Sequence, residues 1–569
     1  MTAAGETSTA AEAGYNPKSS RSHALTLTIL RLLGVCALFA IAVAAIHPTE
    51  FFGLSEDDSI YLSSARALAN GHGYLLESVP GSPPATKYPV LFSWLLSWTW
   101  RWQPAFPANL KLALGLNAFF GFAFIFAAFF FLRCFKALND LERVLLVAFC
   151  GLHPVVLFHA ANLLSDLPFA AVVLSALALY VGMPERDENG WMVLCCGFFG
   201  GAALALRTLG LPIVAGLVLG FVLRRRWRAL GVFSLGAAPL SCVWLSGIRL
   251  AHAQTPVGAS ACSSVWRANW LYYTDYLGFW RADLLQNHVV WQSLKQSVLL
   301  LLLQPGSYVI APTSLSGLLA FVPALVLTVL ALSGAWKAMR GGRISVVLLV
   351  LCLYSVPVVI WDYPAMARFL MPFLPLFVAG AWTEGKRVFT RVAATVRAHG
   401  LRQEGPAIVV LSLAALGLVI GMGGSLWKGH VALIEQAKRR ASIGTEKREA
   451  YDWLRNNAQA GASVIAYEDA ALYLYSGHQA FRPVIFLPAG RFKSAILESE
   501  LGCISESSVE TRAEYWVVSE DDFDFEWEPA ATDGLDQEKR FLGGRPLLFR
   551  SRAGRVRIYR VASDAERQR

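Results

Sequence analysis

The residues from Ser55 to Tyr61 include three consecutive acids, Glu56, Asp57 and Asp58, just after the first long apolar segment of the chain. A carboxylate in such a place can take a proton from a hydroxyl group, which is the work of a general base. Ser55 and Asp58 have the spacing of a helix capping box, which gives Asp58 a structural role. Asp57 has no such role, so we predict that it faces a cleft as the active acid.

A second set of charged residues falls at the ends of apolar segments, where basic groups could hold a phosphate. Its members are Lys87, Asp166, Arg207 and Arg368. Arg207 stands between two apolar runs, and a charge there is a functional candidate by default. The others have structural alternatives: contact with lipid headgroups for Lys87, a helix N-cap for Asp166, and an ion pair with Asp362 for Arg368.

The composition indicates a membrane protein with many spans. Of 569 residues, 55% are hydrophobic and 16% are charged, which is unlike a soluble domain. The net charge of +10 arises largely from basic residues in short loops between apolar runs. Membrane topology explains these residues better than nucleic-acid binding does, so we predict no nucleic-acid partner.

Apolar segments predict about 11 transmembrane helices. They lie near 25–46, 110–132, 143–160, 165–182, 191–206, 210–223, 229–249, 314–336, 343–361, 366–382 and 405–426. The basic loops that follow alternate segments are predicted to be cytoplasmic. The apolar runs 88–102 and 294–303 would break this alternation if they spanned, and the first is rich in tryptophan. We therefore predict that both lie at the outer membrane surface.

This topology divides the chain into three parts. Residues 1–24 are expected to be a disordered cytoplasmic N-terminus, and 25–426 a transmembrane module with external loops at 47–109 and 250–313. Residues 430–569 are expected to form a small α/β domain outside the cytoplasm. In that domain a helix is predicted near 445–458, and strands near 463–467, 515–518 and 556–559.

The sequence gives little support for a metal site or a disulfide framework. The nine cysteines are scattered, and only Cys262 and Cys503 fall in predicted external regions, where a bridge is conceivable. His153 and His159 have no acid or cysteine at ligand spacing. The acidic run 520–526 lacks the glycine and spacing of a calcium loop and is expected to be solvated. We predict no metal site, and dependence on a divalent cation stays open.

Four stretches in the predicted external regions resemble the GT-C class of polyprenyl-phosphate-dependent glycosyltransferases. Within that class they are most similar to the branch with protein O-mannosyltransferases and the lipid A aminoarabinose transferase. The stretches are Asp57–Tyr61 with the following Ala67–Tyr74, then Pro83–Leu91, Asn162–Pro168 and Leu206–Gly210. The chain departs from this pattern in having Asp58 where glutamate is common, and in lacking an Asp-x-Asp motif at Asp166.

The resemblance implies a GT-C-like fold and an inverting glycosyltransferase on the outer face of the membrane. It would move a sugar from a polyprenyl-phosphate donor to the hydroxyl of a lipid, glycan or protein. Asp57, Asp58 and Asp166 would be catalytic, with Asp57 as the base. The residues that would bind the donor phosphate are Lys87, Arg207 and Arg368. Possible substrate contacts are Glu56, Tyr61 and Tyr88.

Two other functions remain open at this point. A lipid or glycan transporter or flippase would show buried mid-membrane charges and internal repeats, which the sequence lacks. A non-catalytic envelope assembly protein would have no use for the acids and the lysine of the first external loop. The absence of a nucleotide-binding motif fits a lipid-linked donor. We expect an integral protein of a bacterial inner membrane, with membrane lipids as its surroundings.

Overall fold

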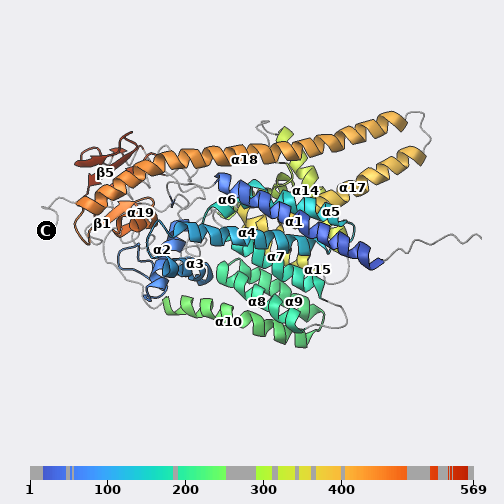
Figure 1. Cartoon of the computed structure of the whole chain (residues 1–569), viewed down its shortest axis with the longest axis horizontal. Helices are drawn as coiled ribbons and strands as arrows, with labels where there is room; N and C mark the ends of the chain where they lie inside the picture. The colour runs from blue at the N-terminus through green and yellow to red at the C-terminus, as the bar shows by residue number, and fades with distance from the viewer. Residues whose placement is uncertain are drawn as a thin grey trace, which may run out of the picture.

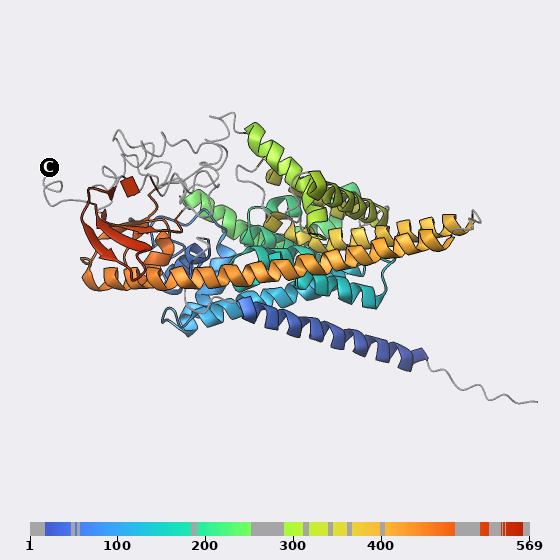
Figure 2. The ribbon, with the colours of Figure 1, turned by 90° about the horizontal axis from the view of Figure 1, so that it is seen from above.

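The computed structural model describes residues 17–46, 52–53, 57–183, 190–251, 290–310, 318–339, 345–360, 367–398, 404–483, 513–522, 536, 539–540 and 542–561. A helical bundle forms most of it, and a small sheet lies at one end (Figures 1 and 2). The predicted cysteine bridge between Cys262 and Cys503, the residues Ser55 and Glu56, and the aromatic-rich part of the loop 250–313 lie outside the described residues.

The first three helices are α1 (Pro17–Ile46), α2 (Asp57–Ala69) and α3 (Val90–Trp102). The first begins eight residues before the predicted apolar start at residue 25. The third has 13 residues, about 20 Å of helix, which is too short to cross a bilayer core of about 30 Å. It exposes Trp94, Trp98 and Trp102, as the prediction of a surface helix requires.

The remaining helices form the bundle, and the last of them continues from the bundle to the sheet. They are α4 (Leu110–Leu132), α5 (Asp140–Gly151), α6 (Pro154–Ala161), α7 (Asp166–Gly182), α8 (Gly190–Leu206), α9 (Gly210–Leu223), α10 (Trp227–Ala251), α13 (Val290–Ser307), α14 (Leu318–Met339), α15 (Ser345–Val359), α16 (Ala367–Leu370), η3 (Met371–Phe373), α17 (Leu374–Ala398) and α18 (Glu404–Asn457). Of these, α7 is buried on nearly all sides and packs against α4 and α8. A helix that is apolar all round belongs at the centre of a bundle.

The chain is an integral membrane protein, although the predicted number of spans is not confirmed. Among the described residues, four helices are long and apolar enough to cross a membrane, or five if one bent pair counts as a span. That pair covers the predicted span at 143–160, and it is bent by 55° where α5 and α6 meet. Pro154 begins α6 and lacks the N–H that a continuous helix would need there.

Two glycines allow α14 and α17 to touch through their backbones. A Cβ atom on Gly334 would lie 2.0 Å from the Gly380 oxygen, and one on Gly380 would lie 2.1 Å from the Ala331 oxygen. Small residues at helix contacts permit this approach within membranes.

We expect Gly380→Ala to separate α14 from α17 and to lower the thermal unfolding midpoint, at a cost of about 1–3 kcal/mol in unfolding free energy. The matched control is Gly385→Ala on the same helix, where an added Cβ meets nothing within 4 Å. Alanine favours helix over glycine, so the control should be neutral or stabilising. Equal midpoints for the two variants would contradict the close contact.

One helix joins the bundle to the small sheet. The 54 residues of α18 extend about 80 Å along one side of the molecule (Figure 1). This corrects the prediction of a span at 405–426 followed by a separate helix near 445–458. The chain does not break at the predicted domain boundary, so the division into domains stays a prediction.

The sheet contains β1 (Ser463–Ala466), β2 (Ala480–Phe481), β3 (Ala513–Ser519), β4 (Leu547–Arg550) and β5 (Val556–Arg560), with α19 (Asp469–Ser476) after β1. The strand order is β2-β1-β3-β5-β4. The β1 strand pairs in parallel with β2 and β3, and β5 pairs antiparallel with β3 and β4. The three strands predicted from sequence are therefore present, and they form an apolar core with the end of α18.

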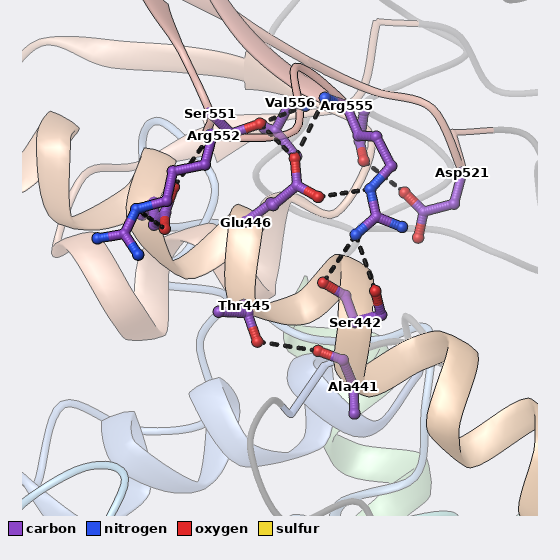
Figure 3. Close-up of polar contacts among 11 residues, drawn as sticks. Ala441, Ser442, Thr445, Glu446, Asp521, Ser551, Arg552, Arg555 and Val556 are labelled. Atoms are coloured by element: carbon purple, nitrogen blue, oxygen red, sulfur yellow. Dashed lines mark hydrogen bonds and ion pairs between the residues drawn. The ribbon is translucent and has the colours of Figure 1, made fainter.

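Polar contacts fix the sheet to α18 (Figure 3). Glu446 accepts hydrogen bonds from Ser551 Oγ and Arg555 Nε, both at 2.5 Å. The Arg555 guanidinium also donates to the carbonyl and hydroxyl oxygens of Ser442, at 3.1 and 2.9 Å. Paired and bonded charges of this kind hold a fixed geometry.

The sheet and α19 also contact the first predicted external loop. Ala480 N donates to Ser78 O at 2.8 Å, and Gln479 Nε2 donates to Glu77 O at 3.1 Å. Nearby, α19 packs against α2. The domain therefore covers α2, the helix that begins with Asp57.

Candidate functional site

Asp57 is the first residue of α2 and is held from two sides. Tyr88, just before α3, donates its hydroxyl to Asp57 Oδ1 at 2.5 Å. Arg368 Nη1 lies 3.6 Å from Asp57 Oδ2, and the two side chains remain 27% and 19% exposed. The Asp57 carboxylate is therefore oriented and partly exposed, and its role as the active acid stays a prediction.

Arg368 reaches this place because two tyrosines fix its segment. Tyr354 donates its hydroxyl to Phe369 O at 2.7 Å, and Tyr308 donates to Ala367 O. The alternative partner considered for Arg368, Asp362, lies outside the described residues. The ion pair that the structure does describe is the one with Asp57.

Asp166 and Arg207 form a second, more buried ion pair. Arg207 Nη1 lies 2.6 Å from Asp166 Oδ2, and their side chains are 17% and 3% exposed. Asp166 is the first residue of α7, whereas the N-cap position belongs to Ser165. The N-cap alternative for Asp166 is therefore wrong, although a first-turn acid still suits the helix dipole.

The turn before Asp166 is fixed by α4. Asn117 Nδ2 donates to the carbonyl oxygens of His159 and Asn162, both at 2.5 Å. This buried amide therefore holds the end of α6 and the turn together. The stretch Asn162–Pro168, one of the four that carry the family resemblance, gains its position in this way.

Tyr61 and Ser165 join the two ion pairs into one cluster. The Tyr61 hydroxyl and Ser165 Oγ lie 2.7 Å apart, and Arg207 Nη1 donates to Ser165 Oγ at 3.3 Å. The Tyr61 ring lies 4.7 Å from the Tyr88 ring, measured between centroids. We call these residues the α2–α7 cluster; its members are Asp57, Tyr61, Tyr88, Ser165, Asp166, Arg207 and Arg368.

Phe369 lies between the two arginines. Its ring is 6.0 Å from the Arg207 guanidinium and 5.4 Å from that of Arg368, close enough for cation–π attraction. Sequence reasoning missed both Phe369 and Ser165. Adjacency to Asp166 was a usable signal for Ser165, whereas nothing local marks Phe369, because its role depends on tertiary contacts.

Lys87 lies at the edge of the α2–α7 cluster. Its Nζ is 5.1 Å from the Tyr88 ring centroid, so its neighbour Tyr88 connects it to Asp57. The structure thus brings together Asp57, Tyr61, Tyr88, Asp166, Arg207 and Arg368, with Lys87 beside them. Glu56, predicted as a substrate contact, is outside the described residues.

Asp58 is not part of this cluster, which corrects its predicted catalytic placement. Its side chain is 2% exposed and accepts a bond from Ser59 N at 2.7 Å. Ser55, its predicted partner in a capping box, lies outside the described residues, so that role stays a prediction. Burial raises the pKa of Asp58 to about 7, against the opposing effects of the Ser59 N–H and the charge of Arg440 on α18.

Buried charges continue from Asp58 into the small domain. Lys447 is 2% exposed and contacts Glu468 at 2.7 Å and Asp521 at 2.8 Å. Burial raises the pKa of Glu468 to about 7, although Lys447 opposes that rise. Asp522, also buried, accepts from Ser519 N at 2.7 Å. Asp521 and Asp522 are therefore structural, which corrects the expectation of a solvated loop at these two residues, whereas Glu520 is exposed and 523–526 lie outside the described residues.

Asp58→Asn should make stability less dependent on pH. Asp58 ionises near 3.8 when unperturbed and near 7 in the fold, so the folded protein binds more protons between these values and loses stability as pH rises. The thermal midpoint of the variant should exceed that of wild type by an amount that grows from about pH 4 to about pH 7, then stays constant. The upper limit is about 4 kcal/mol of unfolding free energy.

The control for that measurement is Asp452→Asn, which changes a carboxylate with 39% side-chain exposure on α18. Its midpoint should follow that of wild type at each pH, because an exposed ion pair contributes little. A difference between Asp58→Asn and wild type that is the same at pH 4 and pH 8 would contradict the burial of a charge at Asp58.

Two smaller features lie next to the α2–α7 cluster. A pocket of about 40 Å³ is lined by Arg207, Thr208 and Phe369 with neighbouring apolar residues. That volume holds a few water-sized groups, so a small anionic group could meet the Arg207 guanidinium there.

His159 is buried, and its Nε2 has no hydrogen-bond partner among the described residues. The sequence analysis considered it only as a metal ligand and missed this unpaired nitrogen.

Within the parts of the chain that the structure describes, no three His, Cys, Asp or Glu residues come together as metal ligands. The seven cysteines described there are free thiols. Dependence on a divalent cation therefore stays open.

Comparison with known proteins identifies the fold. No family model matches the sequence, and no curated protein matches it. Among solved structures, ArnT from Cupriavidus metallidurans bound to undecaprenyl phosphate has a TM-score of 0.51 at 12% identity, over 95% of this chain and 99% of that one. The oligosaccharyltransferase AglB from Archaeoglobus fulgidus, in complex with an inhibitory peptide and a dolichol-phosphate, has a TM-score of 0.52 at 13% identity, over 94% and 74%. The predicted GT-C fold is confirmed.

Proposed function

We propose that this GT-C-fold membrane protein is an inverting glycosyltransferase that uses a polyprenyl-phosphate-linked sugar as its donor. The observation that carries the proposal is the α2–α7 cluster, in which an oriented, accessible carboxylate lies beside two arginines. The similar structures support the class of donor, since one contains undecaprenyl phosphate and the other a dolichol-phosphate. Lipid phosphates of this kind suit a site at the membrane surface.

In this proposal Asp57 is the general base. Its carboxylate accepts the proton of the acceptor hydroxyl while that oxygen attacks the anomeric carbon of the sugar. The bond from that carbon to the phosphate oxygen breaks in the same step, and polyprenyl phosphate leaves. Because displacement is direct, the configuration at the anomeric carbon inverts. The hydrogen bond from Tyr88 fixes the direction in which Asp57 faces the acceptor.

The arginines of the cluster are suited to the departing phosphate. Arg207 borders the small pocket, and its charge is oriented by Asp166 at 2.6 Å. Arg368 lies 3.6 Å from Asp57, and Lys87 lies 5.1 Å from the centroid of the Tyr88 ring. Preorganised cations of this kind stabilise negative charge that develops in a transition state. Asp166 is then a positioning residue for Arg207.

The small C-terminal domain is placed to take part in acceptor selection. It packs against α2, which begins with Asp57, and it forms hydrogen bonds to the loop around Ser78. We propose an orientation in which this end of the bundle faces away from the cytoplasm, in agreement with the basic loops at the opposite ends of the helices.

The test is transfer of radiolabelled sugar from membrane-derived polyprenyl-phosphate donors, measured separately in lipid, glycan and protein fractions. The purified full-length chain in nanodiscs should deplete the donor and label one fraction, with polyprenyl phosphate as the second product. A folded protein that leaves a broad donor panel unchanged would overturn the proposal. Movement of intact donor across the bilayer without transfer would instead identify a flippase.

A further inference from the structure

A second cavity lies at the opposite end of the bundle from the α2–α7 cluster. It has a volume of about 1110 Å³ and is bordered by α4, α7, α8, α14 and α17. The N-terminus of α7 carries Asp166, whereas the cavity is lined by its C-terminal part, including Gly182. Along α7 the distance from Asp166 to the cavity runs from about 14 Å at Ser175 to about 24 Å at Gly182.

The side chains of this cavity are divided by chemistry. Phe126 and Phe130 on α4 face it and are 38% and 54% exposed. They stand four residues apart, so they share one face of the helix. At the end of α4 the lining changes to Arg133 and Lys136. The cavity is therefore apolar along the helices and basic where they end.

The basic part has an excess of positive charge. Lys337 and Arg387 line it and share one carboxylate, that of Glu384, with Arg387 at 2.6 Å. Arg133 and Lys136 are exposed and form no ion pair within the part of the chain that the structure describes. Among the described residues, four cations line the cavity, and Glu384 pairs with two of them, which favours an anionic ligand.

From this arrangement we propose that the cavity binds an anionic diacyl phospholipid from the leaflet on that side. The headgroup phosphate would contact Arg133 and Lys136, and the acyl chains would cover Phe126 and Phe130. Basic pockets between transmembrane helices, on the face with the positive loops, are suited to acidic headgroups. The volume exceeds the range of about 300–1,000 Å³ usual for small-molecule sites, which favours a lipid over a free metabolite.

The charge of the cavity is tested with Arg133→Gln/Lys136→Gln. Delipidated full-length protein is titrated with phosphatidylglycerol, and the thermal midpoint is followed. Wild type should be stabilised at lower lipid concentrations than the variant by about 30-fold, which corresponds to about 1 kcal/mol for each lost charge. The matched control is Arg228→Gln/Arg391→Gln, which removes two exposed basic residues that do not line the cavity. The control should respond as wild type does.

The apolar part is tested with Ala178→Trp, which fills the cavity from α7 without a change in charge. This variant should also lose the response to phosphatidylglycerol. Native mass spectrometry of wild type should detect one bound phospholipid after mild delipidation, and less in both cavity variants.

Three results would overturn the proposal. Phosphatidylcholine could stabilise wild type as well as phosphatidylglycerol does, which would remove the need for an acidic headgroup. Inorganic phosphate alone could give the full effect, which would identify a site for free phosphate. The charge variant and its control could respond alike. None of these measurements depends on sugar transfer, so they are independent of the function proposed for the α2–α7 cluster.

Discussion

Asp57→Asn should lower the rate of sugar transfer by about 10³-fold, within the range of about 10²–10⁴ that general bases contribute. Asparagine is nearly the same size and can still accept the Tyr88 hydroxyl hydrogen bond, so the site should keep its shape. It cannot take the proton of the acceptor. The loss should therefore fall on kcat, and donor binding should change by only a few fold. The measurement is single-turnover transfer with the donor at saturating concentration.

The neighbouring acid provides the matched control. Asp58→Asn removes a carboxylate one residue away that is buried outside the cluster, so transfer should stay within a few fold of wild type. Tyr88→Phe is informative for a different reason, because it leaves the base but removes its hydrogen bond. We expect an intermediate loss of about 10-fold, since the base is present but less well oriented. Activity of Asp57→Asn above a tenth of wild type would contradict its role as the base.

The contrast between Asp57 and Asp58 shows what the sequence could and could not predict. Their different roles followed from helix geometry, since adjacent side chains on a helix point in different directions. The capping box offered for Asp58 stays a prediction, since Ser55 lies outside the described residues, and it did not anticipate the burial of Asp58. Its side chain is buried against residues such as Arg440 and Glu468, which are more than 380 residues away along the chain. No local pattern encodes such a contact.

The same distinction applies to the fold. The strands at 463–466, 513–519 and 556–560 were predictable because short runs of β-branched and aromatic residues are local signals. The continuity of α18 was not predicted, because the change from apolar to charged residues near 426 was interpreted as a boundary. A helix satisfies its backbone within itself in lipid and in water. Good helix-forming residues such as Lys438 and Glu435 then let it continue beyond the apolar segment.

Ion pairing within the site was also beyond local prediction. Arg207 was a candidate because it interrupts apolar sequence, and Asp166 because it lies in a stretch that resembles glycosyltransferases, but their pairing depends on how α7 and α8 pack. The resemblance to glycosyltransferases placed both residues in one external region without assigning them to each other. The structure shows that Arg207 and Asp166 lie 2.6 Å apart. The two residues can therefore be replaced singly and together to test the ion pair.

Arg207→Gln should destabilise the protein by about 3–5 kcal/mol, because it leaves the Asp166 carboxylate buried without its cation. It should also reduce transfer, since the donor phosphate would lose a positive group. These two effects can be separated. In Asp166→Asn/Arg207→Gln, two neutral amides replace the ion pair, so no uncompensated charge is left in the interior. The thermal midpoint should recover most of the loss.

Transfer should not recover in the double variant, and this difference decides the role of Arg207. If the arginine were only structural, restoring stability would restore the rate. If it stabilises the departing phosphate, the double variant is well folded and still slow. Asp166→Asn alone keeps the cation but loses the group that orients it, so its rate should lie between wild type and the double variant. Transfer by the double variant at the wild-type rate would remove Arg207 from the proposed mechanism and leave Arg368 and Lys87 as the phosphate-binding groups.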